Sequence, residues 1–277
     1  MTFFIAVILG IHIINPDLNS SESFSYTTPC TISVEGCESF YIILPIRDTH
    51  WNLHEGQGER GLGVDTLSFT TLEFYETMLI IPDEDGILPE AGTFYITTEA
   101  ITNTINTIEP PHHVIPNTVQ ISLRPDNSYV GYLYELINTP FIMAPRTTPG
   151  GFNQADERLG TDCAGLAVYG RRRMGYTRVH YLGPRGILPY LDPITDEEYY
   201  LTGNIYTTIT GDTAIAPERG DILHFRSQVS IFLEDKGILG ILDIEDMLIQ
   251  SWFDGTHICR IADNGFTDYP LRLYRWK

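Results

Sequence analysis

The sequence predicts an α+β protein in which a β-rich unit precedes a unit with one helix packed on an antiparallel sheet. Two observations lead to this class. Short β-rich runs separated by turn residues dominate residues 38–125, and a helix signal at residues 160–176 precedes a hairpin signal at residues 220–237. The chain has 277 residues, of which 43% are hydrophobic and 19% charged. It can therefore bury a sizeable core, and its length favours two compact units.

Residues 1–25 are predicted to be an export signal and a tether. The apolar stretch at residues 3–14 is long enough for the core of a signal peptide and too short to span a bilayer. No positive charge precedes it and no small-x-small cleavage pattern follows, so a truncated signal and a buried first strand remain alternatives. The polar stretch at residues 15–25 is typical of a tether and favours export, to the periplasm or the cell exterior.

Residues 26–128 are predicted to form the β-rich domain. The runs that read as strands are residues 40–44, 67–74, 77–81, 93–98 and 119–123. Proline, aspartate, glycine and asparagine residues separate them, as in the segments at residues 82–86 and 124–128. No motif in this domain indicates a function.

The cysteines and histidines of this domain leave two questions open. Cys30 and Cys37 flank a short segment, so they form either a small disulfide loop, which would imply an oxidising compartment, or two unrelated thiols. Imidazole and carboxylate groups are ordinary metal ligands, and this domain has two groups of them: His50, His54, Glu55 and Glu59, and the pair His112 and His113. Glycines surround the first group, and adjacent histidines on an extended segment point in opposite directions. We therefore predict neither a metal site nor a cofactor.

Residues 129–277 are predicted to form the second domain. An amphipathic helix at residues 129–137 comes first, followed by a loop rich in proline and glycine. After the helix signal of residues 160–176, the hairpin would turn at Arg226 and Ser227, and strands are expected at residues 239–242, 247–252 and 256–262. Cys259 alternates with apolar residues in the last of these strands and is expected to pack as a small apolar side chain.

Cys163 occupies the start of the predicted helix. Asp162 is a good N-cap, apolar residues follow it at helical spacing, and Gly175 is a stop signal. The unpaired N–H groups and the positive end of the helix dipole favour a thiolate at this position. A nucleophile would occupy such a place, although a small buried cysteine would also fit it.

The charge of the chain excludes some partners. Its formal net charge is −19, with 36 acidic against 17 basic residues, so nucleic acids and anionic membrane surfaces would be repelled. No integral membrane segment is predicted beyond the export signal. The basic run at residues 171–173 falls near the end of the cysteine helix, where cations complement the helix dipole.

Five segments in order resemble the catalytic domain of NlpC-type cysteine peptidases, which are papain-like hydrolases of bacterial cell-wall peptides. These segments are INTPFIMAP, GTDCAG, GDILHF, QVSIFLED and LIQSW, and the resemblance covers residues 129–265. It implies a papain-like fold for residues 129–277 and a cell-wall peptide, or a similar peptide, as substrate. It also implies that Cys163 attacks the peptide carbonyl while a histidine at the start of the next strand takes its proton.

The sequence departs from that pattern at the base. Gln228 stands where the family has histidine, and Gln250 stands at or near the position that orients it. A glutamine cannot accept a proton at ordinary pH, so another imidazole would have to replace it. His224 is the first candidate, but a two-residue turn at residues 226–227 would place it on the face opposite to Gln228. Only a bulge or a longer loop would bring it to the same face. His180 and His257 are less constrained.

Two functions follow from these residues. The first is an exported cysteine hydrolase that cleaves an amide in cell-wall peptides, with Cys163 as nucleophile, His224 as a displaced base, and Gln228 and Gln250 as positioning groups. The second is a catalytically silent domain that binds a peptide or a glycan because Gln228 replaces the expected histidine. The retained cysteine favours the first.

Overall fold

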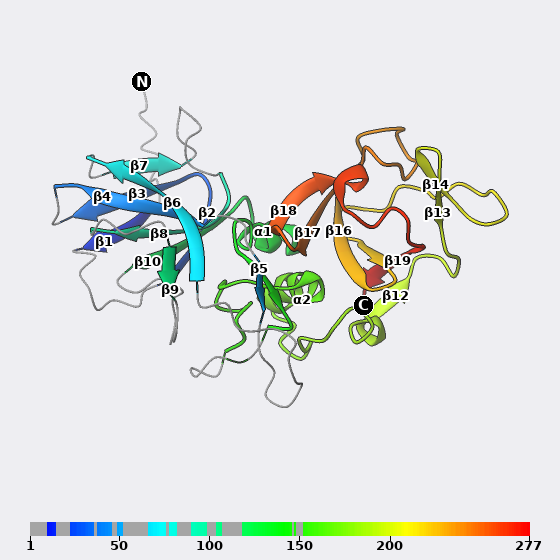
Figure 1. The fold of residues 1–277 in the computed structure, drawn as a ribbon, viewed down its shortest axis with the longest axis horizontal. Helices are drawn as coiled ribbons and strands as arrows, with labels where there is room; N and C mark the ends of the chain where they lie inside the picture. The colour runs from blue at the N-terminus through cyan, green and yellow to red at the C-terminus, as the bar shows by residue number, and fades with distance from the viewer. Residues whose placement is uncertain are drawn as a thin grey trace, which may run out of the picture.

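The computed structural model describes residues 10–14, 23–35, 38–45, 49–51, 66–75, 78–81, 90–98, 104–106, 118–145, 147 and 152–277. Two six-stranded sheets lie at opposite ends of the molecule, and the helices α1 and α2 lie between them (Figure 1). Within these residues, no helix has the length and apolar character needed to cross a bilayer.

The N-terminal half contains two sheets. In the smaller sheet, β3 (Cys30–Glu35) pairs in parallel with β1 (Gly10–Ile14) and antiparallel with β7 (Met78–Ile81). The larger sheet has the order β2 (Ser23–Thr27), β10 (Val119–Arg124), β8 (Gly92–Thr97), β4 (Phe40–Pro45), β6 (Thr66–Phe74) and β9 (Thr104–Asn106). The strands predicted at residues 40–44, 67–74, 77–81, 93–98 and 119–123 are confirmed to within one residue at each end.

The core of this half is formed by apolar side chains of β3, β4, β8 and β10. Ile32, Ile42, Ile96 and Ile121 are among its fully buried members. Cys30 belongs to the same core and is a free thiol, and burial raises its pKa to about 11. Cys37 lies outside the described residues, as do His54, His112 and His113.

Two helices connect the halves. α1 (Tyr129–Tyr134) is shorter than predicted, and α2 (Cys163–Arg173) begins and ends near the predicted residues, with Asp162 as its N-cap. Between them, β11 (Phe141–Met143) pairs with β5 (Thr49–Trp51). Gly175, which has a φ of 96°, follows α2 in the left-handed region that glycine adopts at little cost.

The C-terminal sheet has the order β12 (Leu191–Pro193), β19 (Leu271–Trp276), β15 (Ile222–Phe225), β16 (Gln228–Glu234), β17 (Met247–Trp252) and β18 (Gly255–Arg260). All of its pairings are antiparallel. The short segments beside it are η1 (Leu188–Tyr190), η2 (Ile261–Asp263) and the hairpin of β13 (Tyr200–Thr202) and β14 (Ile205–Thr207).

Both faces of this sheet are covered. Ile222, Val229, Ile231 and Ile249 pack with the helices on one face. On the other face, side chains of the opposite parity, such as Leu223, Phe225, Phe232 and Leu248, pack with the loops that follow β14 and β18. The strands β15, β16 and β17 therefore present alternate residues to two different cores.

The predicted α+β class, with a papain-like domain at residues 129–277, is wrong. Strands account for 43% of the structure and helices for 12%, with two α-helices and several sheets. The sequence signals overstated the helices, because residues 135–137 form turns and not a continuation of α1. The C-terminal unit is built mainly from long-range antiparallel strand pairs, and its two helices cover only one face of the sheet.

The strand predicted at residues 239–242 is also absent. Leu239 is 88% exposed, and the backbone around it is held by carboxylates of the same loop. Asp243 accepts hydrogen bonds from the N–H groups of Ile238 and Glu245, and Asp246 accepts one from Lys236 at 2.9 Å. Such local bonds give the backbone an alternative to a strand ladder.

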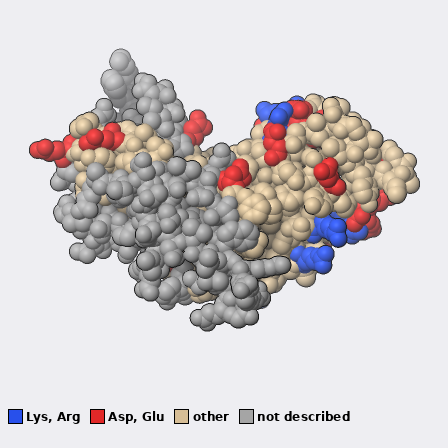
Figure 2. Space-filling view, in the orientation of Figure 1, with Lys and Arg blue, Asp and Glu red and all other residues tan. Residues whose placement is uncertain are grey.

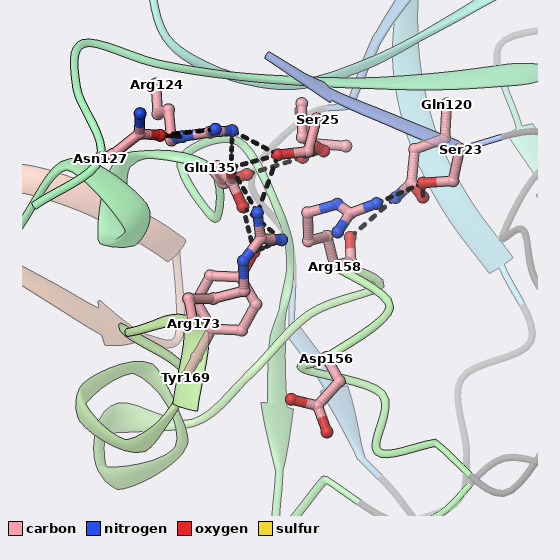
Figure 3. Close-up of polar contacts among 12 residues, drawn as sticks. Ser23, Ser25, Gln120, Arg124, Asn127, Glu135, Asp156, Arg158, Tyr169 and Arg173 are labelled. Atoms are coloured by element: carbon pink, nitrogen blue, oxygen red, sulfur yellow. Dashed lines mark hydrogen bonds and ion pairs between the residues drawn. The ribbon is translucent and has the colours of Figure 1, made fainter. Parts of the chain in front are cut away.

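A buried carboxylate joins the two halves. Glu135, whose side chain is fully buried, lies 2.7 Å from Arg124 of β10 and 3.1 Å from Arg173 of α2. Tyr169 of α2 donates its hydroxyl hydrogen bond to the same carboxylate, and Ser25 of β2 donates another (Figure 3). The basic run in α2 thus has a structural partner, because Arg173 neutralises a charge that would be costly to bury alone.

Candidate functional site

The start of α2 is built by Asp162. One carboxylate oxygen accepts a hydrogen bond from the N–H of Gly165 at 2.7 Å, and the other accepts one from Ala144 at 3.0 Å. The first bond satisfies an N–H group that has no partner within the helix, and the second ties the preceding loop to the helix. The prediction of a helix that begins at Cys163 is confirmed.

The Cys163 thiol is buried and neutral. Its residue is 5% exposed and belongs to the core between α2 and the C-terminal sheet. Burial raises the pKa of the thiol far above its usual value, and the neighbouring Asp162 carboxylate raises it further. Hydrogen bonds from backbone N–H groups, including that of Val229, lower the pKa of the thiol, but the effect of burial is larger. Desolvation therefore overrides the helix dipole that would favour a thiolate.

Gln228 and Gln250 lie on the other face of the sheet. Val229 and Ile231 pack with α2, so strand alternation directs Gln228 and Ser230 away from the helix, toward the face that Phe232 covers. Gln250 has the parity of Leu248, which lies on that same face. The two glutamines contact each other, since Gln228 Nε2 lies 3.4 Å from Gln250 Oε1.

Gln250 is the centre of a buried polar row. Its Oε1 also accepts a hydrogen bond from Ser230 Oγ at 3.3 Å, and its Nε2 donates one to the carbonyl of Asn264 at 3.3 Å. His257 Nε2 lies 3.5 Å from Gln250 Nε2, while His257 Nδ1 lies 2.9 Å from the carbonyl of Gly255. Because a carbonyl only accepts, Nδ1 carries the hydrogen and Nε2 is the acceptor for Gln250. This row binds three strands and a loop together.

The His224 side chain contacts the loop after α2 and not the two glutamines. The turn at residues 226–227 has two residues, Phe225 pairs with Gln228, and no bulge interrupts the pairing of β15 with β16. His224 therefore lies on the face opposite to Gln228, as predicted for such a turn. Its Nε2 lies 3.2 Å from the carbonyl of Pro184, to which it donates, and its ring meets that of Tyr274 edge-on at 5.9 Å. Burial lowers the pKa of His224.

The four predicted site residues are thus not assembled around the thiol. Gln228 and Gln250 meet each other, but within residues 152–277 no hydrogen bond from Cys163 to His180, His224 or His257 is formed. Among the described residues, Asp162 is the titratable neighbour that shifts the pKa of the Cys163 thiol. Residues 152–277 therefore supply no imidazolium to pair with a thiolate at this position.

A hollow of about 160 Å³ opens beside the start of α2. It is lined by Ala144, Pro145, Asp162, Gly165, Tyr181, Leu182 and Gly183. Burial raises the pKa of the Asp162 carboxyl to about 6, against the hydrogen bonds from Gly165 and Ala144 that lower it. Tyr181 and Leu182 are about 20 residues from Asp162 in the sequence, and no spacing pattern connects them to the helix start.

No group of three or more histidine, cysteine, aspartate or glutamate residues suited to a metal occurs in the described part of the chain. Comparisons with protein-family models, with curated proteins and with solved structures found no match to this chain.

Proposed function

We propose that this chain binds a peptide or a glycan without cleaving it. The observation that carries the proposal is the buried, neutral thiol of Cys163, which has no imidazole partner in residues 152–277. Cysteine hydrolases need a thiolate, or a base that removes the thiol proton during attack. Of the two functions that the sequence predicts, the silent binding domain needs neither.

Within residues 152–277, the two buried histidines, His224 and His257, would each have to leave their present partners to act as the base of a hydrolase. His224 is held by the carbonyl of Pro184, and His257 is held by the carbonyl of Gly255 and the Gln250 side chain. Both rings are at least nine-tenths buried, so a rotation would leave buried polar groups without partners. Such groups cost about 1–3 kcal/mol each, which opposes the rearrangement.

The hollow beside α2 supports the binding role. Its volume of about 160 Å³ is below the roughly 300–1,000 Å³ of pockets that enclose whole small ligands. It would therefore accept one residue, or one sugar substituent, of a longer chain lying across the surface. Tyr181 and Leu182 supply apolar surface there, and Asp162 supplies a carboxyl group.

Hydrolysis is tested with purified peptidoglycan, which is the probe that the NlpC-type resemblance and the predicted export suggest. The wild-type protein and Cys163→Ala are incubated with it, and released peptides are measured by mass spectrometry. The proposal expects no release above buffer from either protein. Release by the wild type and none by Cys163→Ala would establish the hydrolase and reject this proposal.

Binding is tested by cosedimentation with the same material. Gly183→Leu adds a bulky side chain at the lining of the hollow, where an added Cβ meets nothing within 4 Å and so does not disturb the fold. Asn204→Leu adds the same side chain at an exposed position between β13 and β14. We expect the wild type and Asn204→Leu to sediment with peptidoglycan and Gly183→Leu to remain soluble. Equal sedimentation of all three, or of none, would contradict binding at this hollow. Competition by free stem peptides or by peptide-free glycan strands then identifies the ligand.

A further inference from the structure

A second hollow, of about 360 Å³, lies where β15 and β19 end beside the loop that follows α2. His224 and Arg226 reach it from β15 and its turn, and Arg272 and Tyr274 reach it from β19. His224 is directly paired with Arg272 in the sheet, so these side chains project from a rigid platform. Arg185 completes the basic lining from the loop.

This lining is basic in a strongly acidic chain. The chain has 17 basic residues, of which Lys236 and Lys277 are the two lysines, so it has 15 arginines. Three of them line this hollow, with Glu198 as the one acidic member. The net charge of the chain is −19, and Figure 2 shows basic side chains confined to a few places on the face that it displays. Positive charge concentrated at a hollow is the pattern that attracts anions.

Two of the three guanidinium groups have no partner in the part of the chain that the structure describes. Arg272 lies 3.0 Å from Glu198, to which its Nε also donates at 3.1 Å. Within the described residues, Arg185 and Arg226 form no hydrogen bond or ion pair. Guanidinium groups present a planar fork of donors that matches carboxylate and phosphate oxygens. The contact of Glu198 with Arg272 shows that a carboxylate can bind a guanidinium group at the wall of this hollow.

The backbone at Arg226 is strained. Its φ is 47°, in the left-handed region where a residue with a side chain costs about 1–2 kcal/mol. Glycine or asparagine is the common choice at such a turn position. An arginine that occupies it while its side chain lines the hollow indicates that the guanidinium, and not the turn, sets the residue type.

We propose that this arginine pocket binds an oxyanion, a carboxylate or a phosphate, carried by a small ligand. Arg185 and Arg226 supply the free donors, Arg272 and the Tyr274 hydroxyl supply further donors, and Leu188 and Pro270 give the apolar surface for the rest of the ligand. His224, neutral and bonded to Pro184, forms part of the wall. This site is independent of the thiol and of the binding proposed beside α2.

The test measures binding of four probes to the full chain by calorimetry and NMR titration. The probes are inorganic phosphate, phenyl phosphate, N-acetylphenylalanine and its uncharged amide. We expect at least one anion to bind with a Kd of about 1 mM or tighter and the amide not to bind. The probe that binds more tightly shows whether the oxyanion is a phosphate or a carboxylate.

Matched variants separate the pocket from general charge. Arg185→Gln and Arg226→Gln should each weaken anion binding about tenfold, whereas Arg178→Gln, at an exposed arginine outside the lining, should leave it unchanged. The NMR signals of His224 and Tyr274 should shift on binding in the wild type, which tests the site even if a variant fails to fold. Absence of binding at about 10 mM of any anion, or equal weakening by Arg178→Gln, would overturn the proposal.

Discussion

The two hollows on either side of the loop at residues 181–185 differ in how their polar groups are satisfied. Residues 181–183 line the hollow beside α2, and Arg185 lines the arginine pocket. Beside α2, Asp162 is bonded to two N–H groups and the nearby thiol is neutral and buried. In the arginine pocket, the guanidinium groups of Arg185 and Arg226 are exposed and form no hydrogen bond or ion pair with any residue that the structure describes. Among the described residues, the Asp162 carboxylate is therefore bonded within the chain, whereas the guanidinium groups of Arg185 and Arg226 are available to a ligand.

The largest effect on stability is expected from the loss of the buried Glu135 carboxylate, which contacts Arg173 of α2. Glu135→Ala would leave Arg124 and Arg173 near a buried site without their counter-charge, so we expect a loss of about 3–5 kcal/mol in the free energy of unfolding. Urea denaturation measures it. The control Glu218→Ala removes an exposed partner of Arg275 and should cost no more than about 1 kcal/mol. Equal costs would show that the buried network is not what supports α2.

A smaller loss of stability is expected from a substitution in the buried polar row around Gln250. Gln250→Ala removes the acceptor used by Gln228 and Ser230, and we expect it to cost about 1–3 kcal/mol of unfolding free energy. Oxyanion binding at the arginine pocket should remain unchanged, because no lining residue is altered. If Gln250→Ala is as stable as the wild type, the row does not hold the strands together.

The Asp162 carboxyl gives a pH dependence with a defined sign. Its pKa is about 6 in the folded chain and 3.8 in the reference state, so between these values the folded state holds the proton more tightly. Stability from this group is therefore present at low pH and is lost as the pH rises through about 6. Asp162→Asn keeps the capping oxygen and does not titrate.

The measurement is urea unfolding of both proteins from pH 4 to pH 7. The stability of the wild type relative to Asp162→Asn should fall by about 1–2 kcal/mol across this range. A difference that is constant or that increases with pH would contradict the assigned protonation.

The smallest effect on stability is expected in the arginine pocket. Arg226→Gly relieves the left-handed backbone, so the free energy of unfolding should rise by about 1 kcal/mol or less while oxyanion binding weakens. Thermal denaturation and the phosphate titration measure the two quantities. A clear loss of stability would mean that Arg226 is retained for the fold, and the contrast between the two hollows would disappear.

The sequence predicts local structure better than it predicts the site. The helix start at Cys163 and the two-residue hairpin turn are confirmed because capping and turn residues act locally. The α+β class fails because the amount of strand depends on pairing across the chain, as between β15 and β19. The arginine pocket escaped prediction because Arg185, Arg226 and Arg272 come from three separate segments, and no spacing pattern connects them.

The protonation of the Cys163 thiol likewise depends on long-range packing that no local sequence pattern shows. Its place at a helix start was readable, but the desolvation that reverses the effect of the dipole depends on side chains of α2 and of strands far along the sequence, such as Val229 and Ile249. The resemblance to NlpC-type peptidases remains a prediction, and so does the location outside the cytoplasm.

Whether the Cys163 thiol is buried and neutral is tested most directly by its rate of alkylation with iodoacetamide at pH 6 and pH 8. Peptide mass mapping identifies the modified cysteine. Cys259 is half-buried and serves as the internal comparison. We expect Cys163 to stay unmodified at both pH values and Cys259 to be labelled at pH 8. Cys163 should react once guanidinium unfolds the chain. Rapid labelling of Cys163 in the folded protein at pH 6 would reveal a reactive thiolate and contradict the account.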